Sequence, residues 1–279
     1  MKILVIGLGQ LGKDLLLVLG DTHEVAGVDI PDIDITSRES IESVCDLQGP
    51  ELIINAAAYT DVEGAETDSE MAYAVNDQGA QLIGEVSAER SIPVVHYSTD
   101  FVFDGKSDLP YSTDAPTNPL SVYGASKLAG EHSLAKANPN HFIMRTAWLY
   151  GPGGNNFIEK IIGWTRKNDV VRVVTDEVGS PTHTWDLAWA TSKLIETDRY
   201  GLYHVVNQGS CSRFELATAI VETLGIDVTL EPCLSAEFPT VAERPMYSVL
   251  DSTKLQEVIG ETMAPWQATL ARYLQRREN

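Results

Sequence analysis

The chain has 279 residues, and its 40 acidic and 20 basic residues give a formal net charge of −20 at pH 7. This charge excludes the basic surface that nucleic-acid binding requires, and no apolar run is long enough to span a bilayer. Three scattered cysteines argue against a disulfide framework or a zinc site, and the N-terminus shows no secretory leader, so we expect a cytoplasmic protein with no nucleic-acid or membrane partner.

The N-terminal thirty residues carry a dinucleotide-binding pattern. A continuous apolar run at 2–6 predicts a strand covered on both faces, and Gly7, Gly9 and Gly12 follow in a Gly-x-Gly-x-x-Gly turn that opens a predicted helix. The next predicted strand ends in Asp29. In this order, the turn brings the backbone close to a pyrophosphate at a helix N-terminus, and the acid accepts hydrogen bonds from ribose hydroxyls.

Two further predicted strands, at 51–55 and 93–98, lead to the carboxyl edge of the sheet, where open α/β sheets bind ligands. The first is followed by Ala-Ala-Ala-Tyr-Thr at 56–60. These small residues either let the backbone pass close to a flat cofactor or make a plain tight contact between a helix and a strand. The second strand delivers Thr99 and Asp100 to the same edge.

Tyr123 and Lys127 stand four positions apart at the start of a predicted helix, so both lie on one face. A phenol and an ammonium arranged in this way form a proton-transfer pair, because the cation lowers the pKa of the phenol from about 10 toward the working range of a general acid. The same spacing is common in surface pairs on helices, so the upstream context decides between the two interpretations.

The last third of the chain is less regular. A fifth predicted strand at 142–146 leads to Trp148, and a bend rich in glycine and asparagine follows at 151–156. Another strand is predicted at 170–174. Helices and short strands then alternate, at 184–197, 202–206, 213–224 and 228–232.

These elements predict an α/β fold: a Rossmann-type, doubly wound parallel sheet with a smaller C-terminal substrate-binding lobe. We expect the dinucleotide-binding domain to comprise residues 1–150, with returning segments at about 170–190 and 233–250. The substrate-binding lobe is then expected mostly in 151–279.

Four of these signals together resemble the extended short-chain dehydrogenase/reductase family: the glycine turn, the Asn-Ala-Ala-Ala segment after the third strand, Ser98–Thr99, and the Tyr123/Lys127 pair. Within that family, longer segments resemble the dTDP-4-dehydrorhamnose reductases. These segments are 96–105, 145–151, 155–157 and 244–248. The resemblance covers essentially the whole chain.

The resemblance implies an oxidoreductase that transfers hydride from NADPH or NADH to the 4-keto group of dTDP-4-dehydro-L-rhamnose, giving dTDP-L-rhamnose for polysaccharide biosynthesis. It implies that Thr99, Tyr123 and Lys127 are catalytic, with Tyr123 as the proton donor. Pattern and resemblance together predict cofactor contacts for Gly7, Gly9, Gln10, Leu11, Gly12, Asp29, Asp34, Ile35, Ala56, Ala57, Ala58, Tyr59, Thr60, Tyr123 and Lys127. Substrate contacts are expected from Thr99, Asp100, Phe101, Trp148, Asn156 and Arg244.

The chain departs from the resembled pattern at two positions. Its first glycine turn is one residue shorter, and Phe101 stands where the family often has Tyr, which removes one hydrogen bond worth about 1 kcal/mol. The choice of cofactor also stays open. Asp29 repels the 2′-phosphate of NADPH, whereas the resembled family commonly accepts NADPH with an acid at this position.

Several alternatives remain at this point. Trp148 is either a core aromatic or a ligand-facing ring, while His96 and His183 are interpreted as structural. Asp176–Glu177 fits either a solvated loop or a Mg²⁺ ion at a homodimer contact, and we predict no metal site. The functional alternatives are a reductase of another nucleotide-linked 4-ketosugar, or a nucleotide-binding regulatory subunit that resembles that of methionine adenosyltransferase.

Overall fold

The computed structural model describes residues 1–277, and its largest element is a six-stranded parallel sheet in the order β10-β5-β4-β3-β1-β2. All five strand pairs are parallel, as expected of strands with continuous apolar runs. The predicted doubly wound α/β fold is therefore confirmed. The strands are β1 (Lys2–Ile6), β2 (Glu24–Val28), β3 (Leu52–Asn55), β4 (Val94–Thr99), β5 (His141–Thr146) and β10 (Gly201–His204).

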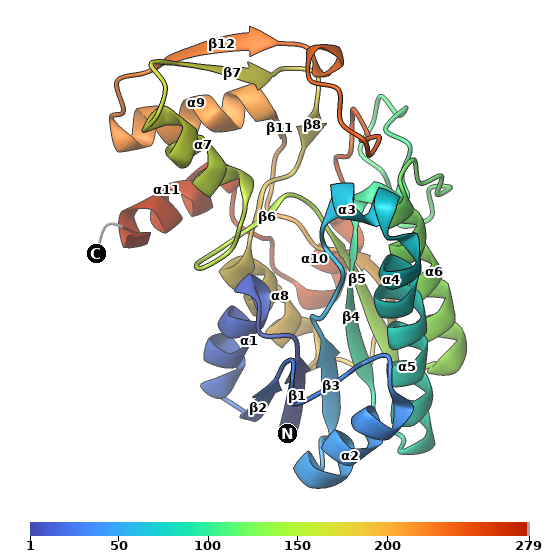
Figure 1. The fold of residues 1–279 in the computed structure, drawn as a ribbon. Helices are drawn as coiled ribbons and strands as arrows, with labels where there is room; N and C mark the ends of the chain where they lie inside the picture. The colour runs from blue at the N-terminus through green and yellow to red at the C-terminus, as the bar shows by residue number, and fades with distance from the viewer. Residues whose placement is uncertain (278–279) are drawn as a thin grey trace.

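Helices cover both faces of this sheet (Figure 1). One apolar cluster joins the sheet to α1, α8 and α10, and a second joins the opposite face to α2, α5 and α6. Each helix buries one stripe of aliphatic side chains, and the side chains of Leu15, Ile83 and Leu134 are fully buried. The six helices are α1 (Gln10–Gly20), α8 (Thr184–Leu194), α10 (Thr253–Ile259), α2 (Arg38–Gln48), α5 (Gly79–Glu89) and α6 (Val122–Ala137).

The helical stretch between β3 and β4 contains an interruption. Helix α3 (Val62–Thr67) leads to α4 (Ser69–Tyr73), and a π-helical segment, Ala74–Gln78, joins α4 to α5. Asn76 in this segment accepts a hydrogen bond from the Tyr59 amide at 2.9 Å and donates one to the Tyr59 carbonyl at 3.1 Å. The widened turn therefore holds the loop that follows β3.

A smaller lobe lies above the carboxyl ends of the strands, at the opposite end of the molecule from the N-terminus (Figure 1). It contains the parallel pair β7 (Val170–Val174) and β12 (Thr229–Cys233), packed with α7 (Phe157–Thr165), α9 (Arg213–Leu224) and α11 (Trp266–Arg277). Short pairs connect lobe and sheet: β6 (Leu149–Tyr150) with β9 (Thr182–His183), and β8 (Val178–Gly179) with β11 (Cys211–Ser212). The remaining turns are the 3₁₀ segments Asp100–Val102 and Ser235–Glu237.

The structure corrects one feature of the predicted topology. The strand predicted at 170–174 forms, but it pairs with β12 in the lobe and does not return to the main sheet. Its residues alternate between exposed and buried, so it has only one covered face. The sixth strand of the main sheet is β10 instead, whose Gly-Leu-Tyr-His sequence carries a weak strand signal. The boundary between the two domains stays a prediction.

Among the described helices, none combines the length and apolar character needed to cross a membrane.

Candidate active site

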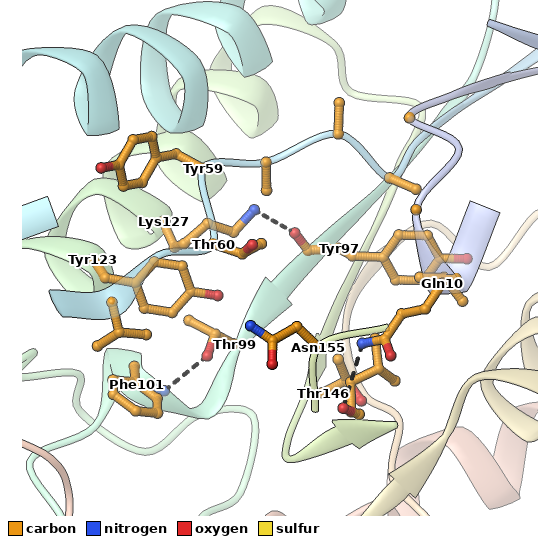
Figure 2. Close-up of a pocket in the computed structure, with 18 of the residues that line it drawn as sticks. Gln10, Tyr59, Thr60, Tyr97, Thr99, Phe101, Tyr123, Lys127, Thr146 and Asn155 are labelled. Carbon is orange, nitrogen blue, oxygen red and sulfur yellow. Dashed lines mark hydrogen bonds between the residues drawn. The ribbon is translucent and has the colours of Figure 1, made fainter. Parts of the chain in front are cut away.

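A cavity of about 1000 Å³ opens at the carboxyl ends of the strands, between the main sheet and the lobe. Its wall combines the turn after β1, the loop after β3, the end of β4, the first turns of α6 and residues of the lobe. All the residues predicted to contact cofactor line it, and so do all the predicted catalytic residues. Figure 2 shows how side chains from these separate elements converge on one space.

In the glycine turn after β1, Gly7 and Gly12 leave no room for a side chain. Gly7 has φ +92°, and a Cβ atom there would lie 2.5 Å from the Ala57 amide nitrogen. At Gly12 a Cβ atom would lie 2.0 Å from the Gly7 carbonyl oxygen. Asp29 accepts hydrogen bonds from the Leu8 amide at 2.7 Å and the Ile30 amide at 2.9 Å, so its carboxylate also supports the turn. The backbone can therefore approach a pyrophosphate, and the turn fits a dinucleotide.

The loop after β3 forms the wall beside this turn. Its small residues leave backbone next to the cavity, while Tyr59 is fixed by Asn76. Asp34 faces the same end of the cavity, and two hydrogen bonds from Thr36 hold the pKa of its carboxyl below the usual value. This end of the cavity is thus built from backbone and carboxylates.

Helix α6 brings Tyr123 and Lys127 into the middle of the cavity. Ser121 caps this helix by accepting a hydrogen bond from the Gly124 amide at 3.2 Å. Figure 2 shows the Tyr123 phenol beside Thr99, with the Lys127 amine turned toward the Tyr97 carbonyl. The Lys127 Nζ atom donates a hydrogen bond to that carbonyl at 2.6 Å. The spacing thus predicted correctly that both residues share one face.

The expectation that Lys127 lowers the pKa of Tyr123 is wrong for this structure. Burial raises the pKa of Tyr123 to about 12, and a hydrogen bond with Thr99 opposes the rise only in part. Burial also lowers the pKa of Lys127 to about 8. The phenol thus holds its proton at neutral pH, as a proton donor must.

The side chain of His96 lies next to the Lys127 amine. The Nε2 atom of His96 lies 3.4 Å from Lys127 Nζ, and its Nδ1 atom lies 3.1 Å from Asn55 Nδ2. Burial holds the pKa of His96 well below its usual value, so the ring is neutral. It lies behind the amine and does not line the cavity.

Thr99 and Asp100 lie where β4 ends. The Thr99 hydroxyl donates a hydrogen bond to Asp100 Oδ1 at 3.1 Å and accepts one from the Phe101 amide at 3.2 Å. Asp100 is only 2% exposed, and burial raises its pKa to about 6. The Phe101 ring meets the Tyr123 ring edge-on at 5.6 Å between centroids.

The lobe contributes one side chain that the sequence did not reveal. Arg213, at the start of α9, lines the cavity, and its Cζ atom lies 3.5 Å from the centroid of the Trp148 ring. Trp148 has φ +47°, and Gly179 makes room for its indole, since a Cβ atom there would lie 2.5 Å from the ring. Of the two interpretations of Trp148, the structure supports the one in which the ring faces the cavity. The capping box of Ser212 and Glu215 was the available signal for Arg213, because it places this residue in the first turn of a helix.

Comparisons with known proteins agree with this geometry. The model of the RmlD substrate binding domain family matches residues 1–279. The chain belongs to the RmlD family. A dTDP-4-dehydrorhamnose reductase of Aggregatibacter actinomycetemcomitans is 37% identical to it, with 96% of this chain and 97% of that protein covered.

Two solved structures resemble this RmlD-family chain over its length. A dTDP-4-dehydrorhamnose reductase from Clostridium acetobutylicum has a TM-score of 0.97 and 38% identity, and the match covers 100% of both chains. The dTDP-4-dehydrorhamnose reductase from Bacillus anthracis in complex with NADP has a TM-score of 0.96 and 36% identity, and the match covers 99% of each chain.

Of two further predicted substrate contacts, one lines the cavity of this RmlD-family chain and the other does not. Arg244 lines the cavity, where its guanidinium donates to Glu63 Oε1 at 2.5 Å and to the Ala242 carbonyl at 3.2 Å. Asn156 does not line the cavity. Its Oδ1 atom caps α7 by accepting from the Glu159 amide, and the neighbouring Asn155 faces the cavity instead. The prediction was wrong by one residue, because a helix cap and a ligand contact both favour asparagine.

Asp176 and Glu177, the acidic pair considered for a divalent ion, have separate partners. Asp176 accepts hydrogen bonds from Ser235, whereas Glu177 lies 3.4 Å from Arg213. Within residues 1–277, no group of three His, Cys, Asp or Glu side chains could hold a metal ion. The structure therefore gives no support to Mg²⁺, and the homodimer stays a prediction.

Proposed function

We propose that this protein reduces the 4-keto group of dTDP-4-dehydro-L-rhamnose, a dTDP-linked 4-keto-6-deoxysugar, to dTDP-L-rhamnose. One observation carries the proposal: Thr99, Tyr123 and Lys127 lie in the same cavity as a glycine turn in which Gly7 and Gly12 have no room for a Cβ atom. Relatives of similar length are dTDP-4-dehydrorhamnose reductases, which supports this substrate.

Bound NADPH or NADH supplies the hydride. The glycine turn and the loop at 56–60 fit the dinucleotide, because Gly7 allows the turn to pack closely against Ala57, which leaves backbone of both segments beside the cavity. Lys127 binds the nicotinamide ribose and keeps a positive charge close to the developing alkoxide. Since its pKa is about 8, the amine is mostly protonated at pH 7.

Tyr123 donates its proton to the sugar oxygen as the ketone becomes an alcohol. Thr99 donates a hydrogen bond to the same oxygen and fixes its position. The raised pKa of Tyr123 keeps the phenol protonated until the alkoxide, a much stronger base, forms beside it.

We further propose that the lobe within 151–279 holds the sugar nucleotide. Arg213 and Arg244 place two guanidinium groups on the lobe side of the cavity, where they can pair with a diphosphate. They supply local positive charge in a chain whose net charge is −20. Trp148, held by Arg213, offers a flat face to the deoxysugar.

The test follows oxidation of NADPH, then of NADH, by absorbance with enzymatically generated dTDP-4-dehydro-L-rhamnose. We expect oxidation by the wild-type protein, and a kcat lowered by about 10²- to 10⁴-fold in Tyr123→Phe with cofactor binding unchanged. Full activity in that variant would refute the role of Tyr123. Cofactor binding without oxidation by the wild-type protein would refute the substrate, and other dTDP-linked 4-ketosugars would then be tried.

A further inference from the structure

A short chain of hydrogen-bonding groups runs from the reacting phenol to a buried acid. Tyr123 shares a hydrogen bond with Thr99, and the Thr99 hydroxyl lies 3.1 Å from Asp100 Oδ1. The other carboxyl oxygen, Oδ2, is buried and has no hydrogen-bond partner within residues 1–277. Asp100 itself lines the cavity in which a sugar would bind.

The ionised form of Asp100 directs the Thr99 hydrogen away from the ketone. A carboxylate only accepts hydrogen bonds, so the single hydroxyl hydrogen of Thr99 must point to Oδ1. The Phe101 amide donates to the hydroxyl oxygen, so the only hydrogen of Thr99 is committed to Asp100. In this state the Thr99 hydrogen does not point to a ketone oxygen.

Protonation of Asp100 reverses the arrangement. The carboxylic acid then donates to the Thr99 oxygen, which already accepts from the Phe101 amide, so both lone pairs are occupied. The Thr99 hydrogen becomes free to donate to the ketone oxygen, beside the proton that Tyr123 donates.

We propose that Asp100 is a positioning residue whose protonated form turns the Thr99 hydroxyl group toward the ketone, so that the acid form of the enzyme is the productive one. This inference rests on the function proposed above. It assigns to Asp100 an action through Thr99, in addition to any contact with the sugar.

The charges around Asp100 place its titration near neutral pH. Burial raises its pKa to about 6, and the hydroxyl groups of Ser248 and Thr99 and the charge of Arg213 from α9 oppose the rise. From α6, the Tyr123 phenol faces Asp100 and is uncharged at this pH. Arg213 itself lies beside Glu177, which neutralises part of its charge.

The test is the pH dependence of kcat and kcat/KM of the full-length protein from pH 5 to 9. For the wild-type protein we expect kcat/KM to fall about tenfold per pH unit above an apparent pKa of about 6. The limb of kcat reports the same group in the complex with the sugar. Activity that stays constant or rises between pH 5.5 and 7.5 would overturn the proposal.

Two variants assign this descending limb of the pH profile to Asp100. Asp100→Asn cannot ionise, so we expect its pH profile to lose the limb, whatever activity the variant loses with the sugar contact of Asp100. Ser248→Ala removes a group that favours the ionised form, so its limb should move to higher pH. A purely structural role would not move the limb. A limb that keeps its position in Ser248→Ala, or that persists in Asp100→Asn, would overturn the proposal.

These outcomes are distinct from failure of the proposed function. If the ketosugar is reduced but no limb belongs to Asp100, only the positioning role is wrong. If the wild-type protein reduces no ketosugar at any pH, the proposed function is wrong and the positioning role falls with it. Where Asp100→Asn does not fold, Ser248→Ala still decides, since a limb that fails to move contradicts the role of Asp100.

Discussion

The two ends of the cavity are built in opposite ways. The end below the glycine turn consists of backbone and carboxylates, with Asp29 and Asp34 facing the space. The end below the lobe carries Arg213 and Arg244, and an aromatic ring stacked on the first of them. A dinucleotide is bound through helix and backbone dipoles, whereas a diphosphate sugar is bound through the guanidinium groups of arginine side chains. This difference between the two ends orients both ligands. If they exchanged positions, the diphosphate of the sugar nucleotide would face carboxylates and would lose its arginine partners.

The largest effect is expected at the glycine turn. A Cβ atom in Gly12→Ala would lie 2.0 Å from the Gly7 carbonyl oxygen, so the turn must open and lose its shape. We expect the Kd for NADH to rise at least about 100-fold, which corresponds to about 3 kcal/mol. Thymidine diphosphate should still bind at the lobe end. Calorimetry with each ligand separately measures both, and Gly20→Ala, with open space around it, is the matched control.

The next effect concerns the lobe end. Replacing Arg213 by Gln should lower kcat/KM about 30-fold, mainly through KM, because one guanidinium for the diphosphate is lost and the Trp148 ring loses its support. The Kd for the cofactor should stay within about twofold, since this residue lies at the other end of the cavity. Steady-state kinetics and cofactor fluorescence measure the two quantities. A comparable loss of cofactor affinity would contradict the separation of the two ends.

The smallest effect is expected at the cofactor end of the cavity. Among the described residues that line the cavity, Asp29 and Asp34 lie at this end with no cation beside them, which disfavours the 2′-phosphate of NADPH. Asp29→Asn should shift the ratio of kcat/KM values for NADPH and NADH about fivefold toward NADPH, or about 1 kcal/mol. Asn keeps one carbonyl oxygen for the Leu8 amide. An unchanged ratio would show that Asp29 only supports the turn.

The sequence was informative where the site is local. The glycine turn, the acid after the second strand and the Tyr123–Lys127 spacing each lie within a few residues, and pattern alone predicts their geometry. The end below the lobe joins residues far apart in the chain, so Arg213 could not be assigned and Asn156 was chosen in place of Asn155.

Burial explains the other two errors. The predicted pKa of Tyr123 considered only the neighbouring cation, whereas desolvation of the phenol dominates in the folded chain. The strand at 170–174 has the right composition but pairs outside the main sheet, because pairing depends on which partner can cover its apolar face. Neither desolvation nor pairing is encoded in a single segment.

The π-helical segment Ala74–Gln78 has a further consequence for how this site tolerates insertions and deletions. It accommodates one residue more than a regular helical turn, and Asn76 within it holds the Tyr59 loop. Deleting one residue here would restore an ordinary helical turn with α4 and α5 still in phase, because the extra residue is accommodated within that one turn. The deletion would displace Asn76, so the Tyr59 loop in the wall of the cavity would lose its two hydrogen bonds. A one-residue deletion at this position would therefore weaken nucleotide binding and leave the stability of the fold largely unchanged.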